Sequence, residues 1–358
     1  MYYLYPDYYK KFHCIADKCS DTCCAEWQIV IDDESLEKYR NYKGDYQQTL
    51  CQNIDWEEGV FGHNKRGKCA FLRDDDLCDM YIHMGEDSLC TTCREYPRHT
   101  EEFENLREIT LSLSCPEVAK IVMNTTEPIT FVTKEDETDE CYEEFDYFLF
   151  SELEDVREEM IRIIQDRNVN LRDRIDKILQ ISVSVQRHYD AGSLISWNEF
   201  EESDRVCVEN EYELFERLFL FLFEEFEILY PQWAEVLVES RLFLFGEGKE
   251  IFEQNKEEFE TWWNTSNLTP LDIVLEQLVV YFTSVYLLGA VYDENILGKV
   301  DACIGHTIEI YLLLLGRWLK HGELAMDDVI EVVYRYSREI EHSDENLERA
   351  EMLNWFAR

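Results

Sequence analysis

Apolar residues beyond residue 145 recur every three or four positions, which is the spacing of one face of an α-helix. Asn170 precedes one such stripe and can cap its helix, because the side-chain oxygen can accept a first-turn N–H. Thr269-Pro270 is typical of a helix start. No alternating, strand-like run follows residue 145. The pattern therefore predicts helices near residues 145–163, 171–185, 212–229, 268–292, 300–319 and 327–340.

The N-terminal third shows weaker periodicity. Residues 27–32 (WQIVID) and 107–113 favour short strands. Asp33 can begin a helix, and residues 85–87 (GED) indicate a turn. Residues 133–144 (TKEDETDECYEE) are polar and acidic, which is typical of an exposed connection.

Cysteine is concentrated early in the chain, where ten of the thirteen occur by residue 115. Disulfides need an oxidising compartment, yet the first residues, MYYLYPDYYKKFHC, lack the apolar run and cleavage site of a secretory signal. A bond between adjacent Cys23 and Cys24 would strain the backbone. Spacings such as Cys90-x2-Cys93 instead favour metal ligands. The predicted ligands are Cys14, Cys19, Cys23, Cys24, Cys69, Cys78, Cys90, Cys93 and Cys115.

Nine thiols exceed the four ligands of one tetrahedral zinc or one four-iron cubane. Either there are two sites, or one site accompanies structural or catalytic thiols. Thiolates suit zinc and iron–sulfur clusters alike, so ligand type does not choose between them. A redox dithiol at Cys90 and Cys93 is a third option, without the strand-then-helix context of that motif. The isolated thiols are expected to be buried and inert: Cys51, Cys141, Cys207 and Cys303.

The expected fold class is mainly α, with a Cys-rich metal-binding N-terminal module of little strand and an all-helical C-terminal half. The module occupies residues 1–123, an acidic connection follows at 124–144, and a helical domain fills 145–358. A chain of 358 residues is long enough to bury a large core.

The formal net charge is −43, of which −33 falls after residue 120. Nucleic acid is excluded as a partner, because phosphate binding needs a basic patch. No stretch reaches the roughly 18 uncharged apolar residues of a membrane span, so no membrane is expected. The negative field can raise the encounter rate with a cationic, lysine-rich protein. The plainer interpretation is that most of these acids only maintain solubility.

Several short segments in the first third of the chain resemble motifs of one protein family, and they occur in the same order as in that family. They are FHCIADKCSDTCCAEWQIVID, KCAFL, LCDMY, LCTTCREYPR and LSLSCPEVAK. Residues 1–123 thereby resemble the flagellin lysine-N-methylase family and carry the Cys-rich signature of zinc- or iron-chelating proteins. The resemblance implies a cytoplasmic bacterial methyltransferase that uses S-adenosylmethionine, acts on lysine side chains of flagellin, and holds a [4Fe-4S] cluster, with zinc as the alternative.

Arg94 and Arg98 flank Tyr96-Pro97 and match the family string LCxxCRxYPR. Either guanidinium can bind the carboxylate of the methyl donor through two parallel hydrogen bonds. The alternative is that each forms a structural ion pair with one of the many nearby acids.

Methylating an amine requires a neutral lysine, which is almost wholly protonated at pH 7. An enzyme must therefore desolvate it or supply a base. His63, His83 and His99 are candidates among many, so the sequence names no catalytic residue, and each is more often a surface or packed histidine.

The donor site has no familiar motif. The chain has no G-x-G-x-x-G array, and C-x3-C-x2-C is absent because Glu26 occupies the third position. The donor can bind an open iron of a three-cysteine cubane, or lie between the helical half and the metal module. Two other functions remain: a non-enzymatic metal-binding protein that docks a basic partner on its acidic helical half, and an electron-transfer protein.

Overall fold

The computed structural model describes the chain except residues 26, 65–66, 138–145, 194–209, 353–354 and 357–358. It is 61% helical with 10% strand, so the prediction of a mainly α protein with a helical C-terminal half is confirmed. The helices are α1 Asp33–Asn41, α2 Gln47–Asn53, α3 Asp79–Met84, α4 Thr91–Glu95, α5 Pro116–Met123, α6 Tyr147–Ile164, α7 Leu171–Asp190, α8 Glu211–Glu224, α9 Pro231–Phe245, α10 Lys249–Thr265, α11 Leu271–Tyr286, α12 Ala290–Asp293, α13 Ile296–His321, α14 Met326–Glu341 and α15 Asp344–Glu351. The strands are β1 Tyr2–Pro6, β2 Ile54–Asp55, β3 Val60–Phe61, β4 Arg98–Phe103, β5 Leu106–Leu111 and β6 Phe131–Glu135.

The predicted helices after residue 145 correspond to α6, α7, α8, α11, α13 and α14. Asn170 caps α7 as expected, with its Oδ1 accepting the Asp173 N–H at 3.0 Å. Asp32 caps α1 in the same way through the Ser35 N–H at 2.9 Å. The sequence pattern missed α9, α10 and α15. In α9 apolar residues cover every side, with Leu237 buried and Leu242 66% exposed, so no one-sided stripe marks the helix.

The chain begins in a four-stranded sheet of order β4-β5-β1-β6. β1 runs parallel to β5 and antiparallel to β6, while β4 and β5 form a hairpin. The strand predicted at 107–113 is confirmed as β5. The strand predicted at 27–32 is wrong, because only Val30 makes an isolated bridge, to Val60. Residues 131–135, expected within an acidic connection, form the edge strand β6. One neighbour and mostly exposed side chains leave such a strand without an apolar signature.

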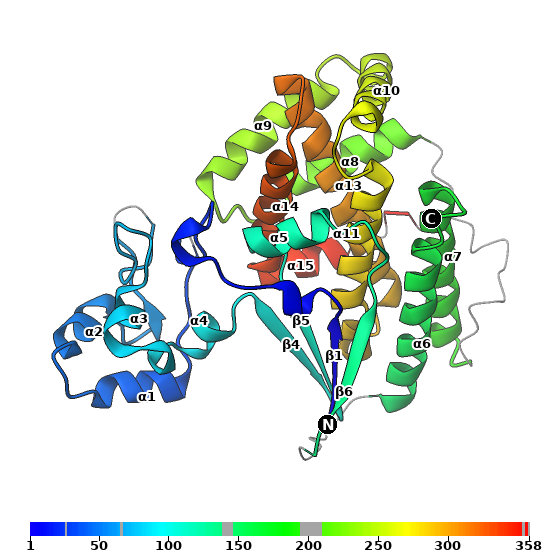
Figure 1. The fold of residues 1–358 in the computed structure, drawn as a ribbon. Coiled ribbons are helices and arrows are strands. Elements are labelled where there is room, and N and C mark those ends of the chain that lie inside the picture. The colour runs from blue at the N-terminus through cyan, green and yellow to red at the C-terminus, as the bar shows by residue number, and fades with distance from the viewer. Residues whose placement is uncertain (26, 65–66, 138–145, 194–209, 353–354, 357–358) are drawn as a thin grey trace.

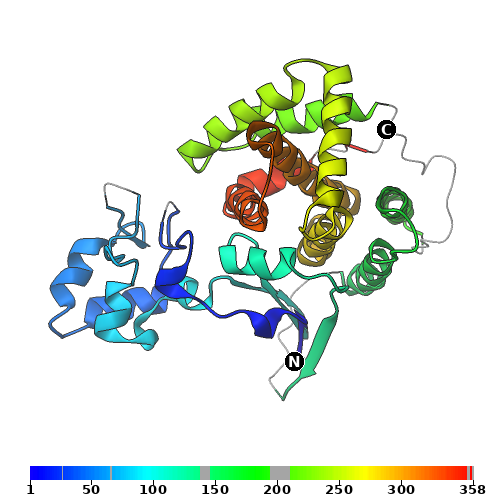
Figure 2. The same ribbon diagram turned by 45° about the horizontal axis from the view of Figure 1, so that its top comes forward.

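Two hydrophobic cores divide the described residues. The smaller one gathers side chains between Ile29 and Cys90, including Tyr39, Leu50 and Phe71. The larger one joins the sheet and α5 to the helices, from Tyr8 to Phe356. Figures 1 and 2 show the lobe of α1–α4 to one side of the helical body, with α5 against α14.

Helix α13 is the centre of the body, in contact with α7, α8, α9, α11 and α15. Two helical stretches are long and apolar enough to cross a membrane, Leu271–Asp293 and Ile296–His321. Their most apolar windows are 72% and 78% buried within the described structure, as expected of core helices.

Candidate functional site

Every cysteine in the described ranges is a free thiol, so the nine grouped cysteines are available as ligands. They fall into two sets. Five belong to the core of the small lobe: Cys69 and Cys90 are buried in it, and Cys24, Cys78 and Cys93 pack against it. The Cys69 N–H donates to the Cys24 carbonyl oxygen at 2.8 Å, which joins two sequence groups. We call Cys24, Cys69, Cys78, Cys90 and Cys93 the lobe set.

The other four thiols lie where the lobe meets the helical body. Cys115 is buried in the larger core, directly before α5. Burial, with a smaller contribution from charge on Cys19 and Cys14, raises the pKa of Cys115 to about 11. The pKa of Cys23 is raised by its hydrogen bond with Cys24, by burial, and by charge on Cys24, Cys115 and Cys14. We call Cys14, Cys19, Cys23 and Cys115 the junction set.

The chemistry of these donors suits a soft metal, because each set combines thiols from distant sequence groups. In the part of the chain that the structure describes, however, no three His, Cys, Asp or Glu side chains have the arrangement of a single-ion site. A zinc ion needs four ligands at roughly 2.0–2.3 Å from one point. A cubane distributes its four thiolates over separate irons and so accepts a wider spacing.

Arg338 of α14 connects the junction set to the helical body. Its Nη1 lies 3.0 Å from Asp21 Oδ2, and its Nε donates to the Ser114 carbonyl oxygen at 3.0 Å. The Cys19 thiol donates to the Asp21 carbonyl oxygen at 3.1 Å. Burial raises the pKa of Cys19, an effect that the Asp21 hydrogen bond and the Arg338 charge partly offset. The guanidinium therefore lies directly behind the loop that carries the thiols.

An aromatic group fills the same junction. His342 stacks on Trp27 with ring centroids 4.8 Å apart, and Tyr96 approaches it edge-on at 6.4 Å. The Trp27 ring N–H donates to the Cys23 carbonyl oxygen. Burial and then the charge of Arg338 lower the pKa of His342 to about 4, so the imidazole is neutral at pH 7. Sequence reasoning missed His342, since no motif surrounds it.

Arg94 and Arg98, which were predicted to bind the methyl donor, each contact other residues of the protein. Arg94 is exposed on α4 and pairs with its neighbour Glu95 at 3.1 Å. Arg98 begins β4, donates to the Tyr9 hydroxyl at 3.0 Å and covers the Phe12 ring. Arg94 thus makes the surface ion pair that was the alternative interpretation, and Arg98 bonds to a tyrosine.

The three histidines of the first third also have local partners. His63 Nε2 is 2.9 Å from the Trp27 carbonyl oxygen, and His83 Nδ1 is 2.9 Å from that of Asp79. His99 lies 2.5 Å from Glu101, whose hydrogen bond raises the pKa of the imidazole. Of the isolated cysteines, Cys303 is buried as expected, whereas the prediction for Cys51 is wrong because it lies exposed on α2. Cys141 and Cys207 fall outside the described residues.

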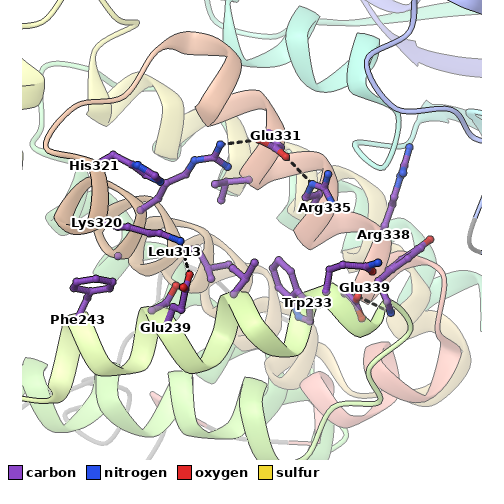
Figure 3. Close-up of a pocket in the computed structure, with 17 residues that line it drawn as sticks. Trp233, Glu239, Phe243, Leu313, Lys320, His321, Glu331, Arg335, Arg338 and Glu339 are labelled. Atoms are coloured by element: carbon purple, nitrogen blue, oxygen red, sulfur yellow. Dashed lines mark hydrogen bonds and ion pairs between the residues drawn. The ribbon is translucent and has the colours of Figure 1, made fainter.

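Two cavities of about 260 Å³ each open in the helical body. The first lies between α9, α13 and α14, and we call it the α9–α14 cavity. Figure 3 shows Trp233 between one end marked by Glu239 and Lys320 and another marked by Arg338 and Glu339. The second is lined mainly by α7, α8, α10, α11 and α13, and we call it the α7–α10 cavity. Arg338, which lines the first cavity, also contacts Asp21 and Ser114 in the segments that carry the junction set.

The residues that form both cavities belong to a recognisable domain. Residues 157–356 match the model of the FliB lysine N-methylase C-terminal domain, which is more than half of the chain. The chain belongs to the FliB lysine N-methylase family. The match includes α14 with Arg338, together with His342, so this domain makes the contacts with the segments that carry the junction thiols.

Individual relatives of this family member cover shorter stretches. The flagellar biosynthetic protein FliU of Salmonella muenchen is 31% identical over 128 residues, which are 33% of this chain and 75% of FliU. The lysine-N-methylases of Salmonella typhimurium and Salmonella choleraesuis are each 30% identical over 128 residues. Those residues are 33% of this chain and only 32% of either enzyme. No solved structure matches the chain.

Proposed function

We propose that the protein transfers methyl groups from S-adenosylmethionine to lysine side chains of flagellin and carries a [4Fe-4S] cluster. The observation that supports this most is the family domain over residues 157–356, whose helix α14 contacts the thiol-bearing loop through Arg338. Relatives named lysine-N-methylase and flagellar biosynthetic protein support the reaction and a flagellar substrate. A cytoplasmic location follows from the same proposal.

The cluster is assigned to the junction set. Four thiols, Cys14, Cys19, Cys23 and Cys115, equal the ligand number of one cubane. Bound there, it would supply soft, redox-active iron beside α14. Arg338 would favour the thiolate form of Cys19 electrostatically. The lobe set would bind a second group or remain as core thiols, and zinc remains the alternative metal.

The chain's own residues contribute position and electrostatics. Methyl transfer forms an N–C bond as the sulfonium S–C bond breaks, and the methylated nitrogen loses a proton to a base or water. The substrate lysine must reach the donor as a neutral amine, which a dry junction favours because burial destabilises the charged form. Trp27, Tyr96 and His342 form an uncharged wall at that junction, since His342 is neutral at pH 7. Acidic surface would attract the lysine-rich partner from solution.

The deciding experiment is mass spectrometry of flagellin after incubation with anaerobically purified protein, S-adenosylmethionine and a reductant. The expected product carries added methyl groups on lysine, and reactions without donor or without protein remain unmodified. A protein that binds flagellin but transfers no methyl group under these conditions would be the metal-binding platform instead. A protein that neither binds nor modifies flagellin, yet cycles its cluster between two oxidation states, would be an electron carrier.

A further inference from the structure

The two cavities have equal volumes, so size does not indicate which one holds a small ligand. Their walls differ in charge. The α7–α10 cavity has four acidic residues against Arg172 and Lys256. The α9–α14 cavity has three glutamates against five basic residues: Arg317, Lys320, His321, Arg335 and Arg338. The glutamates of this wall can face the ammonium or sulfonium of a ligand, and its cations, unusual in a chain with 77 acidic and 34 basic residues, suit an anionic group such as a carboxylate.

Arg317 offers hydrogen-bond donors to such a group. Its Nη2 donates to Asp328 Oδ1 and Glu331 Oε2, both at 2.7 Å. Its Nη1 and Nε make no hydrogen bond among the residues that the structure describes, and the side chain is 27% exposed. Arg335 shares Glu331 through its Nε at 2.9 Å, so Glu331 keeps a cationic partner when Arg317 binds a ligand. Nη1 and Nε lie on different edges of the planar guanidinium, so either of them can donate one charge-assisted hydrogen bond to a carboxylate.

Aromatic side chains occupy the middle of the same cavity. Trp233 lies between the ends marked by Lys320 and Arg338 (Figure 3). Tyr230 and Phe243 line it as well, and Phe243 is 43% exposed. Stacked aromatic pairs contribute beyond their buried area, so this wall favours a flat ring over an aliphatic chain. The cavity therefore combines recognition elements for a planar base and a carboxylate.

The cavity also lies next to the thiols. Arg338 lines it and contacts both Asp21 and Ser114, which are close in sequence to members of the junction set. Tyr230 lines it too, with its hydroxyl 3.5 Å from His342 Nδ1. A ligand in this space would lie on the side of α14 that faces the cysteine loop. The α7–α10 cavity has none of these residues in its wall.

We propose that the α9–α14 cavity binds the methyl donor, with its carboxylate on Arg317 and its adenine beside Trp233. The assignment rests on the proposed function, which supplies the donor. It places the sulfonium between the two recognition points, towards the junction of α14 with the thiol loop. The residues of this site come from α9, α13 and α14, and none of them belongs to the LCxxCRxYPR string.

Binding of two unreactive probes tests the assignment. S-adenosylhomocysteine carries the adenine and the carboxylate, whereas 5′-methylthioadenosine lacks the amino-acid part. Isothermal titration calorimetry on anaerobically purified, metal-containing protein measures both. In Arg317→Gln we expect the affinity for S-adenosylhomocysteine to fall roughly tenfold or more, because the carboxylate loses one charge-assisted hydrogen bond. The affinity for 5′-methylthioadenosine should change less than about twofold, because that probe has no carboxylate.

Two variants complete the design. Arg172→Gln removes an arginine from the wall of the α7–α10 cavity, where it is more exposed than Arg317 and lies 3.7 Å from Glu211, and this variant should bind both probes as the wild type does. Arg317→Lys keeps the positive charge, so its affinity for S-adenosylhomocysteine should fall less than that of Arg317→Gln. Unfolding temperatures equal to that of the wild type would show that both variants fold. Wild-type affinity in Arg317→Gln, or a loss in Arg172→Gln instead, overturns the cavity assignment alone. A wild-type protein that binds neither probe overturns the donor itself and the proposed function with it.

Discussion

Arg338 and Asp21 are 317 residues apart in the chain and form an ion pair with Nη1 and Oδ2 3.0 Å apart. The guanidinium is 4% exposed and the carboxylate 23%. Since Arg338 also donates to the Ser114 carbonyl oxygen, one side chain joins two thiol-bearing segments to α14. Relative placement of the junction thiols therefore depends on a residue of the helical body.

Removing this side chain should destabilise the protein. We expect Arg338→Gln to lower the free energy of unfolding by about 2–3 kcal/mol, because it leaves a partly buried carboxylate and a carbonyl group without their partner. Arg335→Gln is the matched control: Arg335 is 40% exposed and 3.9 Å from the same Asp21 carboxylate, so its loss should cost less than about 1 kcal/mol. Urea unfolding followed by circular dichroism measures both. Equal effects of the two variants would contradict the special role of Arg338.

The second prediction concerns the cluster. Protein purified without oxygen should be brown and contain iron, and Cys19→Ser or Cys115→Ser should lose that iron, because each removes one junction thiol from a four-ligand site. Cys51→Ser is the control, since Cys51 is an exposed thiol on α2 outside both sets. Ultraviolet–visible absorption and iron analysis provide the measurement. Colourless protein with stoichiometric zinc would rule out the cluster.

The third prediction separates the two thiol sets by proteolysis. Cys93 packs against the small core, so Cys93→Ser should loosen the lobe around α1–α4 and leave the larger core folded. Cys23→Ser should have a wider effect, because Cys23 lies at the contact of the lobe with α14. Limited proteolysis with mass mapping should show cuts near residues 24–96 in the first variant. Cleavage spread over α6–α14 would mean that the two cores do not unfold separately.

Most helices that line the cavities could be predicted from the sequence. The pairing of the strands and the grouping of the cysteines could not. A stripe such as that of α14 is local information, and Asn170 signals its cap by residue type alone. The sheet depends on pairing between β1 at residues 2–6 and β6 at 131–135, a contact that no local pattern encodes. The division of the cysteines is hidden for the same reason: adjacent Cys23 and Cys24 belong to different sets, although the sequence places them in one group.

The α9–α14 cavity could not be predicted from the sequence, for a different reason. Its basic residues are spaced along α13 and α14 among many acids, so no basic run marks them. Arg94 and Arg98 were predicted to bind the methyl donor because they belong to a motif, yet their contacts are with Glu95 and Tyr9. A motif can be recognised in the sequence itself. The basic residues of a cavity wall come together only when the helices pack.

The fourth prediction uses a buried acid in α13. Asp301 is fully buried and its Oδ1 has no hydrogen-bond partner among the described residues. Burial, partly offset by the backbone N–H groups of Trp355 and Phe356, raises its pKa from 3.8 to about 7. A raised acid pKa means that the folded state binds more protons between these values, so stability should fall as pH rises from 4 to 7. The loss is at most about 4 kcal/mol.

Asp301→Asn should remove most of that dependence, because the amide is neutral at every pH in this range. At pH 8 the variant should be more stable than the wild type by roughly 2–4 kcal/mol, and at pH 4 the two should nearly agree. Urea unfolding at the two pH values decides the matter. A wild-type protein that gains stability between pH 4 and 7 by the same amount as Asp301→Asn would show that other groups control the pH response.

The last prediction concerns the acidic surface. The residues after 120 carry a net charge of −33, and a lysine-rich partner approaching them would be attracted from a distance. Attraction between exposed charges is screened within about 8 Å at physiological ionic strength. The association rate with flagellin should therefore fall as salt rises, while methyl transfer within the preformed complex should change less, because its groups are already in contact. Stopped-flow measurements at two salt concentrations, with single-turnover methylation beside them, separate the two steps. An association rate that is indifferent to salt would mean that these acids only keep the protein soluble, and that flagellin docks through uncharged contacts.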